Sequence, residues 1–387
     1  MATDAAQQRF RAEVRGWLQE HLTDELRSLS RDEMDDPKAW ELRARWEAEL
    51  ASAGYVGLSW PVEYGGRGAS LREQLAFDEE YAIAAAPDRA GFFGEQLLGP
   101  LLLAHGSAEQ RARFLPRILA GTEFWCQGYS EPGAGSDLAG VRTRATLRDG
   151  QWHIEGQKIW TSLAQFADWI FVLCRTDPES TRHHGLSLLL CPLGQPGVDI
   201  RPIRQLTGGR EFNEVFFDGA RTEADLVVGD VGRGWQVAMA VLGFERGTAF
   251  LGRQRVFARQ YEDLLQRFRG RPLAQRDGGL RDELVQAWIE LQVMRAMGLR
   301  TVQAYANGGV PGPEGSVGKL FWSQWHQRVG ELALRVDGLA GALLAGGRLS
   351  EQQYELLFSR QDTIAAGSSE IQRNILAERV LGLARQP

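Results

Sequence analysis

Hydrophobic residues recur every three to four positions through the first third of the chain. Phe10, Val14 and Leu18 share this spacing on an otherwise charged segment, which is typical of an amphipathic helix. A second helix is predicted from Pro37 to Ala53, because Asp36 can cap it and proline suits the first helical position. The pattern therefore predicts an N-terminal region built from helices.

The period shifts towards two in the middle of the chain. Val141, Thr143, Ala145 and Leu147 alternate with other, mostly polar residues, and Asp149-Gly150 is a strong signal for a hairpin turn. Further short strands are predicted at Trp169–Cys174, Leu186–Cys191, Val198–Ile203 and Val215–Phe217. Five or more such strands at close spacing predict a barrel or a sandwich.

Helical spacing returns beyond Trp235 and holds to the end of the chain. The order helices, strands, helices favours three units over a doubly wound sheet. The predicted fold class is α+β, mainly α. We expect an N-terminal helical domain at residues 1–123, a central β-barrel or sandwich domain at 124–234 and a C-terminal helical domain at 235–387.

Composition and charge exclude several classes of function. The chain has 44 lysines and arginines against 50 acidic residues, a net charge of −6, so the overall charge does not favour nucleic-acid binding and leaves only a local basic patch open. Three cysteines are an odd number for a disulfide framework and lack metal-site spacing, which indicates a reducing compartment. No apolar run approaches the length of a membrane span, and the N-terminus is polar. We expect a cytoplasmic protein without a membrane or nucleic-acid partner.

The first candidate site is the loop Tyr129–Asp137, in which a strand-like run stops in a turn rich in Gly, Ser and Asp. Pro132 fixes one backbone angle, while Gly133 and Gly135 let the backbone approach a ligand closely. By itself such a loop is more often an ordinary tight turn than a binding site.

A carboxylate is the second candidate. Glu245 follows Trp235 on a predicted helix and shares one helical face with Val241 and Thr248, among small and apolar neighbours. Desolvation there would raise the pKa of the carboxyl group, which suits a general base. Spacing alone nevertheless favours a stabilising ion pair with a neighbouring arginine.

The third candidate is the segment Ile364–Arg373. Ser369 and Gln372 have the spacing of a capping box, so we expect a helix to begin near Ser369 with Gly367 just before it. Exposed amides at a helix start suit a phosphate or another anion, although an ordinary cap is the simpler interpretation. The sequence has no G-x-G-x-x-G after a strand, and its histidines show no paired metal-ligand pattern.

Together these segments resemble the flavin-dependent acyl-CoA dehydrogenases. Tyr129–Asp137 is similar to the first signature of that family, Gly156–Ser162 to a strand that lies along the flavin, and Gly367–Arg373 to the C-terminal signature. The three occur in the family's order and separation, and the resemblance covers essentially the whole chain. It implies a C-terminal four-helix bundle, FAD as cofactor and oxidation of an acyl-CoA to the trans-2-enoyl-CoA, with electron-transfer flavoprotein as acceptor.

The resemblance also decides between the two interpretations of Glu245. Many relatives place the catalytic Glu directly before the glycine of the C-terminal signature, where this chain has Ala366. Others, similar to the isovaleryl-CoA type, place it on the first helix of the C-terminal domain, which implies Glu245 as the base here. The resemblance further implies flavin contacts from Tyr129, Ser130, Trp160, Thr161, Ser162, Gly367, Ser368 and Glu370, and substrate contacts from Ser136, Phe244 and Arg246.

One departure from the family concerns assembly. Relatives usually show Arg-x-x-Phe-Gly followed by a Gln that reaches the flavin of the neighbouring subunit, whereas Gln266–Gln275 has different spacing. The glycine-rich motif expected earlier than the C-terminal signature is blurred at Asp337–Gly341. Either Arg271 or a neighbour substitutes, or a second, different subunit supplies the contacts. A homotetramer or dimer is therefore expected, with a heteromeric complex as the alternative.

Within the family, the segments Trp125–Ser130, Ile159–Ala164 and Phe212–Phe217 resemble bacterial dehydrogenases of steroid catabolism. This implies a bulky alicyclic or steroid-derived acyl group. Two other functions compete with this interpretation: a non-catalytic subunit of a heteromeric complex, and a flavin oxidase or monooxygenase on the same fold. The presence of Glu245 argues against both, while the altered interface motif keeps the first of them open.

Overall fold

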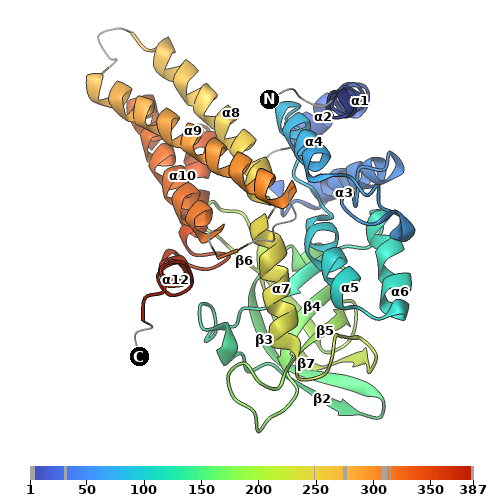
Figure 1. Ribbon diagram of the computed structural model, residues 1–387. Helices are drawn as coiled ribbons and strands as arrows, with labels where there is room; N and C mark the ends of the chain where they lie inside the picture. The colour runs from blue at the N-terminus through green and yellow to red at the C-terminus, as the bar shows by residue number, and fades with distance from the viewer. Residues whose placement is uncertain are drawn as a thin grey trace. The chain divides into compact units, whose positions relative to one another are not determined.

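The computed structural model describes residues 5–29, 33–247, 249–272, 277–306, 312–313 and 315–384, and the side chains of 244–252, 305 and 306 lie outside this description. The chain forms two compact units (Figure 1). The sheet unit combines Leu22–Ser70 with Pro87–Glu245, and the helical unit combines Met1–His21, Leu71–Ala86 and Arg246–Pro387. These units group the residues differently from the three sequence domains, whose boundaries after residues 123 and 234 stay a prediction.

Within residues 33–247 the sheet unit contains one eight-stranded sheet, in the order β6-β7-β3-β2-β4-β5-β8, with β1 paired to β4. The strands are β1 (Trp125–Gly128), β2 (Arg144–Arg148), β3 (Gln151–Ser162), β4 (Trp169–Arg175), β5 (Leu186–Pro192), β6 (Val198–Ile203), β7 (Phe212–Glu223) and β8 (Val227–Val228). Strand β4 runs parallel to β1 and β2, and the other pairs are antiparallel.

The predicted strands are confirmed, and the one predicted at Val215–Phe217 is the centre of the longer β7. The hairpin between β2 and β3 turns at Asp149 and Gly150, which have φ values of 50° and 76°. Both central residues of such a turn need positive φ, and Asp and Gly tolerate it best. Local turn chemistry therefore sets the register of the β2–β3 pair.

The sheet curls around one hydrophobic core. Trp152 and Ile154 of β3 and Val215 of β7 lie in the same buried cluster as Ile170 of β4 and Leu189 of β5. Side chains from both ends of the strand order can meet in one cluster only if the sheet folds over itself. This curvature agrees with the predicted barrel or sandwich.

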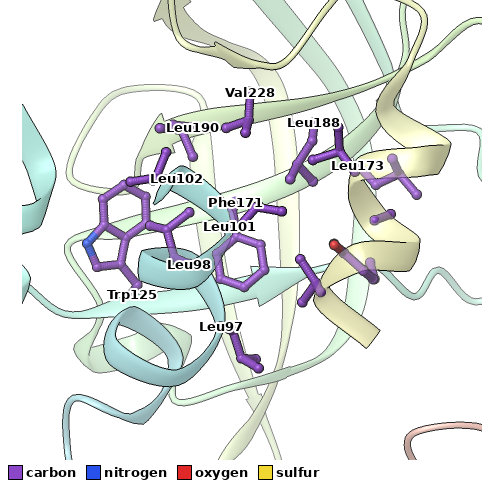
Figure 2. Packing of buried hydrophobic residues seen from close by; sticks show 14 of the residues in the cluster. Leu97, Leu98, Leu101, Leu102, Trp125, Phe171, Leu173, Leu188, Leu190 and Val228 are labelled. Carbon is purple, nitrogen blue, oxygen red and sulfur yellow. The ribbon is translucent and has the colours of Figure 1, made fainter. Parts of the chain in front are cut away.

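The opposite face of β4 and β5 carries a second core, covered by helices (Figure 2). Phe171, Leu188 and Leu190 pack there against Leu98 and Leu101 from the covering helices. The helical elements of the sheet unit are α2 (Asp24–Ser28), α3 (Pro37–Ser52), η2 (Val62–Tyr64), η3 (Phe93–Leu98), α5 (Gly99–His105), α6 (Ala108–Leu119), η4 (Leu138–Gly140), η5 (Ala164–Phe166) and most of α7 (Gly234–Gly247). Because both faces of β4 and β5 are covered, these strands have continuous buried runs instead of alternation.

The helical unit is held by a core between three long helices. Its elements are α1 (Ala5–His21), α4 (Leu71–Ile83), α8 (Ala249–Gly270), α9 (Gly278–Ala306), α10 (Gly315–Asp337), η7 (Gly338–Ala342), α11 (Glu351–Phe358), η8 (Ser359–Thr363), α12 (Ser369–Ile375) and η9 (Leu376–Val380). Phe257 and Leu264 of α8, Leu284 and Met294 of α9, and Trp325 of α10 share this core. Helices α1 and α4 are joined to each other by the Arg15–Glu80 ion pair, at 2.8 Å. The observed order of elements is the predicted one: helices, strands, helices.

Candidate functional site

A buried ion pair fixes the loop Tyr129–Asp137 against β3. Lys158 Nζ lies 2.8 Å from Glu131 Oε1 and also donates to the carbonyl oxygen of Tyr129. The other carboxylate contacts are the backbone amides of Arg142 and Thr143, at 2.6 and 2.9 Å. The buried carboxylate of Glu131 therefore ties the loop to β3. The exposed residues of the loop keep a fixed position as a result.

The charge state of this pair follows from its surroundings. Burial raises the pKa of the Glu131 carboxyl, but the Lys158 ammonium and the backbone amides outweigh it and hold that pKa below its ordinary value. Burial also lowers the pKa of Lys158, against the attraction of Glu131. A buried charge of this kind is stable only with its partner present.

Strand β3 carries a bulge where three predicted flavin contacts lie. The pairing of β3 with β7 is interrupted between Lys158 and Thr161, and Trp160 has a φ of 61°. Trp160 is 57% exposed, and its ring lies nearly perpendicular to that of Phe212. Left-handed backbone at a tryptophan is uncommon and is typical of a functional constraint. The bulge thus presents a large flat ring to solvent beside the anchored loop.

Thr161 follows directly on this bulge. Its side chain is buried, and its hydroxyl oxygen has no hydrogen-bond partner among the described residues. Its carbonyl oxygen accepts from the buried amide of Asn213, at 3.0 Å. A buried hydroxyl without a partner is costly and indicates a group outside the chain that satisfies it. The backbone of Thr161 is therefore held in place, while its hydroxyl is available for a hydrogen bond to a ligand.

The structure brings five of the predicted cofactor residues together in the sheet unit. The carbonyl oxygen of Ser130 accepts from the backbone amide of Ile159 at 2.9 Å. This bond joins the Tyr129–Ser130 end of the loop to the strand that continues into Trp160, Thr161 and Ser162. Ser136 lies farther along the same loop and is exposed. Its neighbour Asp137 is 3.9 Å from the Arg182 guanidinium.

The predicted base lies on α7. The start of this helix is fixed by packing: Val237, Ala238 and Val241 belong to the core beside β4 and β5. A Cβ atom at Gly234 would lie 2.5 Å from the backbone of Ser187, so only glycine permits this approach. Glu245 and its neighbours Phe244 and Arg246 continue the helix, but their side chains lie outside the described residues, so their contacts stay predictions.

The remaining predicted contacts lie in the helical unit, on the turn before α12. Ala366 and Gly367 have φ values of 52° and 92°, and the side-chain amide of Gln372 donates to both of their carbonyl oxygens. Ser368 caps α12 by accepting from the amide of Ile371. Glu370 is exposed in the first helical turn, 3.4 Å from Arg373.

The predicted capping box at Ser369 is therefore wrong by one residue. The cap is Ser368, and Gln372 folds back onto the preceding turn instead of closing a box. The left-handed backbone at Ala366 and Gly367 places Ser368, not Ser369, at the position where the side chain faces the free amides. A sequence spacing of three residues does not contain this information.

Two arginines near the altered interface motif have partners within the chain. Arg267 Nη1 lies 2.6 Å from Asp337 Oδ1, and Arg271 donates to the carbonyl oxygen of Val336 at the end of α10. Cations at the C-terminal end of a helix stabilise its last carbonyls. Arg271 therefore stabilises the C-terminal end of α10 within the same chain.

Sequence reasoning missed the residues that support the site. Lys158 lies at an even spacing from Trp152 and Ile154 and is buried like them on β3, and a lysine in that pattern requires a buried partner. Arg175 likewise donates to five backbone carbonyls, including those of Val141 and His184, and so holds the loops that flank the sheet edge. The periodicity could have identified Lys158, whereas nothing local indicates the role of Arg175.

No group of three or more His, Cys, Asp or Glu side chains among the described residues is arranged to hold a metal ion. Among the same residues, no helix combines the length and apolar character needed to cross a membrane.

Comparison with known proteins covers nearly the whole chain. Family models match in chain order: the acyl-CoA dehydrogenase N-terminal domain at residues 4–122, the middle domain at 126–220 and the C-terminal domain at 232–381. The acyl-CoA dehydrogenase IpdE1 of Mycobacterium tuberculosis is 54% identical over 381 residues, which span 97% of this chain and 98% of that protein.

Solved structures are similar over the same extent. A structure described as the Tcur3481-Tcur3483 steroid ACAD is 30% identical with a TM-score of 0.88, covering 100% of this chain and 99% of that one. The ChsE4-ChsE5 complex from Mycobacterium tuberculosis is 27% identical with a TM-score of 0.84, covering 100% of each chain.

Proposed function

The chain belongs to the acyl-CoA dehydrogenase family, and from this premise we propose that it oxidises a bulky alicyclic or steroid-derived acyl-CoA to its trans-2-enoyl-CoA. The fold is that of the family, with an N-terminal helical domain, a central sheet domain and a C-terminal helical domain. We further propose that electrons pass to an electron-transfer flavoprotein. One observation carries the catalytic part: position 366 is Ala, while position 245 on α7 is Glu.

The proposed base is Glu245. A methyl group at Ala366 cannot take a proton, so the carboxylate must come from elsewhere in the site. The core that fixes the start of α7 through Val237 and Val241 gives this helix a defined direction, which a base needs to reach one α-proton. In the proposed reaction Glu245 removes that proton, and hydrogen bonds at the thioester oxygen stabilise the developing negative charge.

FAD is the cofactor of the family, and the residues of this chain fit it. The open hydroxyl of Thr161 offers a hydrogen bond, and the exposed Trp160 offers a flat apolar surface to a ring system. On the helical unit, the left-handed Gly367 and the capped start of α12 suit the polar part of such a cofactor. When bound, FAD supplies the acceptor for the hydride that leaves the β-carbon.

The acyl group is proposed from two supports. One relative is described as a steroid ACAD, and it aligns with the whole of this chain. The second support is the glycines at positions 243 and 247 on the helix that carries Glu245, because residues without a side chain suit a bulky acyl group. Since helix packing also uses small residues, the relative is the stronger argument.

We propose an oligomeric assembly, and one observation favours a heteromeric complex over a homotetramer or dimer. Arg267 and Arg271, which lie where relatives contact the flavin of a neighbouring subunit, bind Asp337 and the end of α10 instead. The relatives described as Tcur3481-Tcur3483 and ChsE4-ChsE5 are named as pairs of proteins. A different subunit would then complete the cofactor site. We propose the cytoplasm as location, in keeping with three buried free thiols.

The test is the visible spectrum of the purified protein, taken anaerobically while CoA thioesters are added. We expect the absorbance of oxidised flavin to bleach with an alicyclic or steroid-derived thioester. Peroxide formed on admission of air at the rate of turnover would favour the oxidase. A colourless protein that takes up FAD only after addition of a second subunit would support the heteromer, and one that never takes it up would contradict the proposal.

Glu245→Gln tests the base. The variant should bind FAD and thioester while the rate of bleaching falls by at least about 100-fold, because the amide cannot accept the α-proton. Glu262→Gln, on the exposed face of α8, is the matched control and should keep the full rate. Undiminished bleaching in Glu245→Gln would reject the assignment.

A further inference from the structure

A buried histidine links three segments of the helical unit. His326 of α10 places Nδ1 2.6 Å from Asp362 Oδ2 of η8 and Nε2 3.2 Å from Glu355 Oε2 of α11. The side chain of His326 is 6% exposed, and those of Asp362 and Glu355 are 7% and 14% exposed. The ring therefore lies between two carboxylates that are largely withdrawn from water.

The number of available protons decides how this contact works. A neutral imidazole has a proton on only one of its two nitrogens, whereas an imidazolium has one on each. The Nδ1 contact with Asp362 is a hydrogen bond, whereas the Nε2 contact with Glu355 lacks hydrogen-bond geometry and is an ion pair. Only the charged ring can therefore attract Asp362 and Glu355 together. After the loss of one proton, the two carboxylates face a neutral ring. Their mutual repulsion is then no longer compensated and drives them apart.

The cluster holds the segment that enters the C-terminal turn. Lys319 donates to the carbonyl oxygen of Asp362, and Gln327 donates to the carbonyl oxygen of Ser359 at 3.1 Å and to the hydroxyl of Thr363 at 3.0 Å. Three side chains of α10 thus clamp η8.

The clamped segment leads directly into the turn that carries Gly367. The amides of Ile364 and Ala365 both donate to Gln361 of η8, at 2.8 Å. The far end of the turn is held separately by Gln372 of α12. The turn is therefore pinned at two ends, and only the entering end depends on a titratable group.

The imidazole ring of His326 is surrounded by charged and aromatic side chains from four elements. Glu355 faces it from α11 and Asp362 from η8, while Lys319 of α10 neutralises the Asp362 end through the backbone. Helix α8 contributes the uncharged ring of Phe257, 4.9 Å from the imidazole, and the Arg253 guanidinium of that helix lies over Trp322. Burial lowers the pKa of His326, but the two carboxylates outweigh it and raise that pKa above its ordinary value.

We propose that His326 is a positioning residue for the cofactor: as an imidazolium it ties Asp362 to Glu355, and its deprotonation loosens the turn at residues 364–368 and weakens FAD binding. The inference rests on the proposed function for the identity of the ligand. His326 touches neither cofactor nor substrate in this scheme and acts only through η8. Because its pKa is raised, the clamp is complete below about pH 6.5 and is lost as pH rises through the higher folded value.

The experiment measures FAD affinity and amide exchange on the full chain between pH 6 and pH 9, with the second subunit added where FAD uptake needs it. In the unaltered protein the dissociation constant of FAD should rise by about fivefold or more across this range. His326→Gln should remove the pH dependence, and Glu355→Gln should move its midpoint to lower pH, since one carboxylate that favours the charged ring is gone. His105→Gln, an exposed histidine of α5, is the control and should keep the original profile.

Amide exchange at residues 359–368 of the FAD-free chain, corrected for the intrinsic effect of pH, gives an independent result. Protection of this segment should fall with pH in the unaltered protein but not in His326→Gln. If His326→Gln does not fold, the midpoint shift of Glu355→Gln decides the question. Equal profiles in all proteins would overturn the inference while FAD binding itself still supported the proposed function. Loss of protection with pH in a chain that binds no FAD would contradict the proposed function and retain the clamp.

Discussion

At the scale of the residue, the site depends on one buried ion pair. Lys158 is fully buried on β3, and its ammonium is compensated by Glu131 of the loop that carries Tyr129 and Ser130. Replacing such a pair by apolar residues can be neutral, whereas removing one partner leaves an uncompensated buried charge. The pair therefore contributes more to the position of the loop than to net stability.

Lys158→Met should lower the free energy of unfolding by about 3–5 kcal/mol at pH 7, because the Glu131 carboxylate loses its counter-charge. Urea denaturation measures this change. The double variant Lys158→Met with Glu131→Gln should regain part of the loss. Arg144→Met, which breaks the exposed 3.1 Å pair with Glu155 on the neighbouring strand, should cost less than about 1 kcal/mol.

The contribution of the Glu131–Lys158 pair to the free energy of unfolding depends on pH. Since the pKa of Glu131 is lowered on folding, its contribution is present above the unfolded pKa of about 4.3 and is lost as pH falls through the lower folded value. Acid denaturation of Glu131→Gln should therefore lack this component. An equal cost of Lys158→Met and Arg144→Met at pH 7 would contradict the argument.

At the scale of the element, the sequence predicted what local chemistry determines. Asp36 caps α3 as expected, with Pro37 in the first turn, and Asp149-Gly150 forms the expected hairpin. The cap of α12 was misplaced because it depends on the left-handed backbone at Ala366, which no residue type announces. The pairing of Glu131 with Lys158, across 27 positions, likewise depends on the curl of the sheet, which periodicity alone does not specify.

The corrected cap can be tested by a matched pair of variants. Ser368→Ala should destabilise α12 by about 1 kcal/mol, because the amide of Ile371 loses its acceptor. Ser369→Ala should cost less, since the buried hydroxyl of Ser369 has no partner among the described residues. Amide exchange at Ile371 compares the two. Greater loss of protection in Ser369→Ala than in Ser368→Ala would restore the original prediction.

At the scale of the whole molecule, one helix face has the character of an interface. Helix α9 exposes Val285, Trp288, Ile289 and Val293, which are 51%, 50%, 45% and 42% exposed. Val285, Ile289 and Val293 repeat every four residues along one side of the helix, and Trp288 lies at the border between this side and Leu284 of the core. Contiguous apolar residues on the surface of a folded chain are typical of association sites.

The exposed face of α9 and the contacts of Arg267 and Arg271 both favour assembly of this chain with another subunit. If α9 is a contact between subunits, Trp288→Glu should weaken association by at least about 2 kcal/mol, because an exposed tryptophan at an interface is commonly its strongest contact and a buried charge replaces it. Light scattering of the purified assembly, with and without a second subunit, should then show a smaller mass at equal concentration. Gln19→Glu adds the same charge on the exposed surface of α1, outside the altered interface motif, and should leave the mass unchanged. Equal masses for both variants would exclude α9 as the contact.

The same variant also tests whether the cofactor site is complete within one chain. FAD uptake that survives in a separated Trp288→Glu chain would show that Arg267 and Arg271 need no substitute from another subunit.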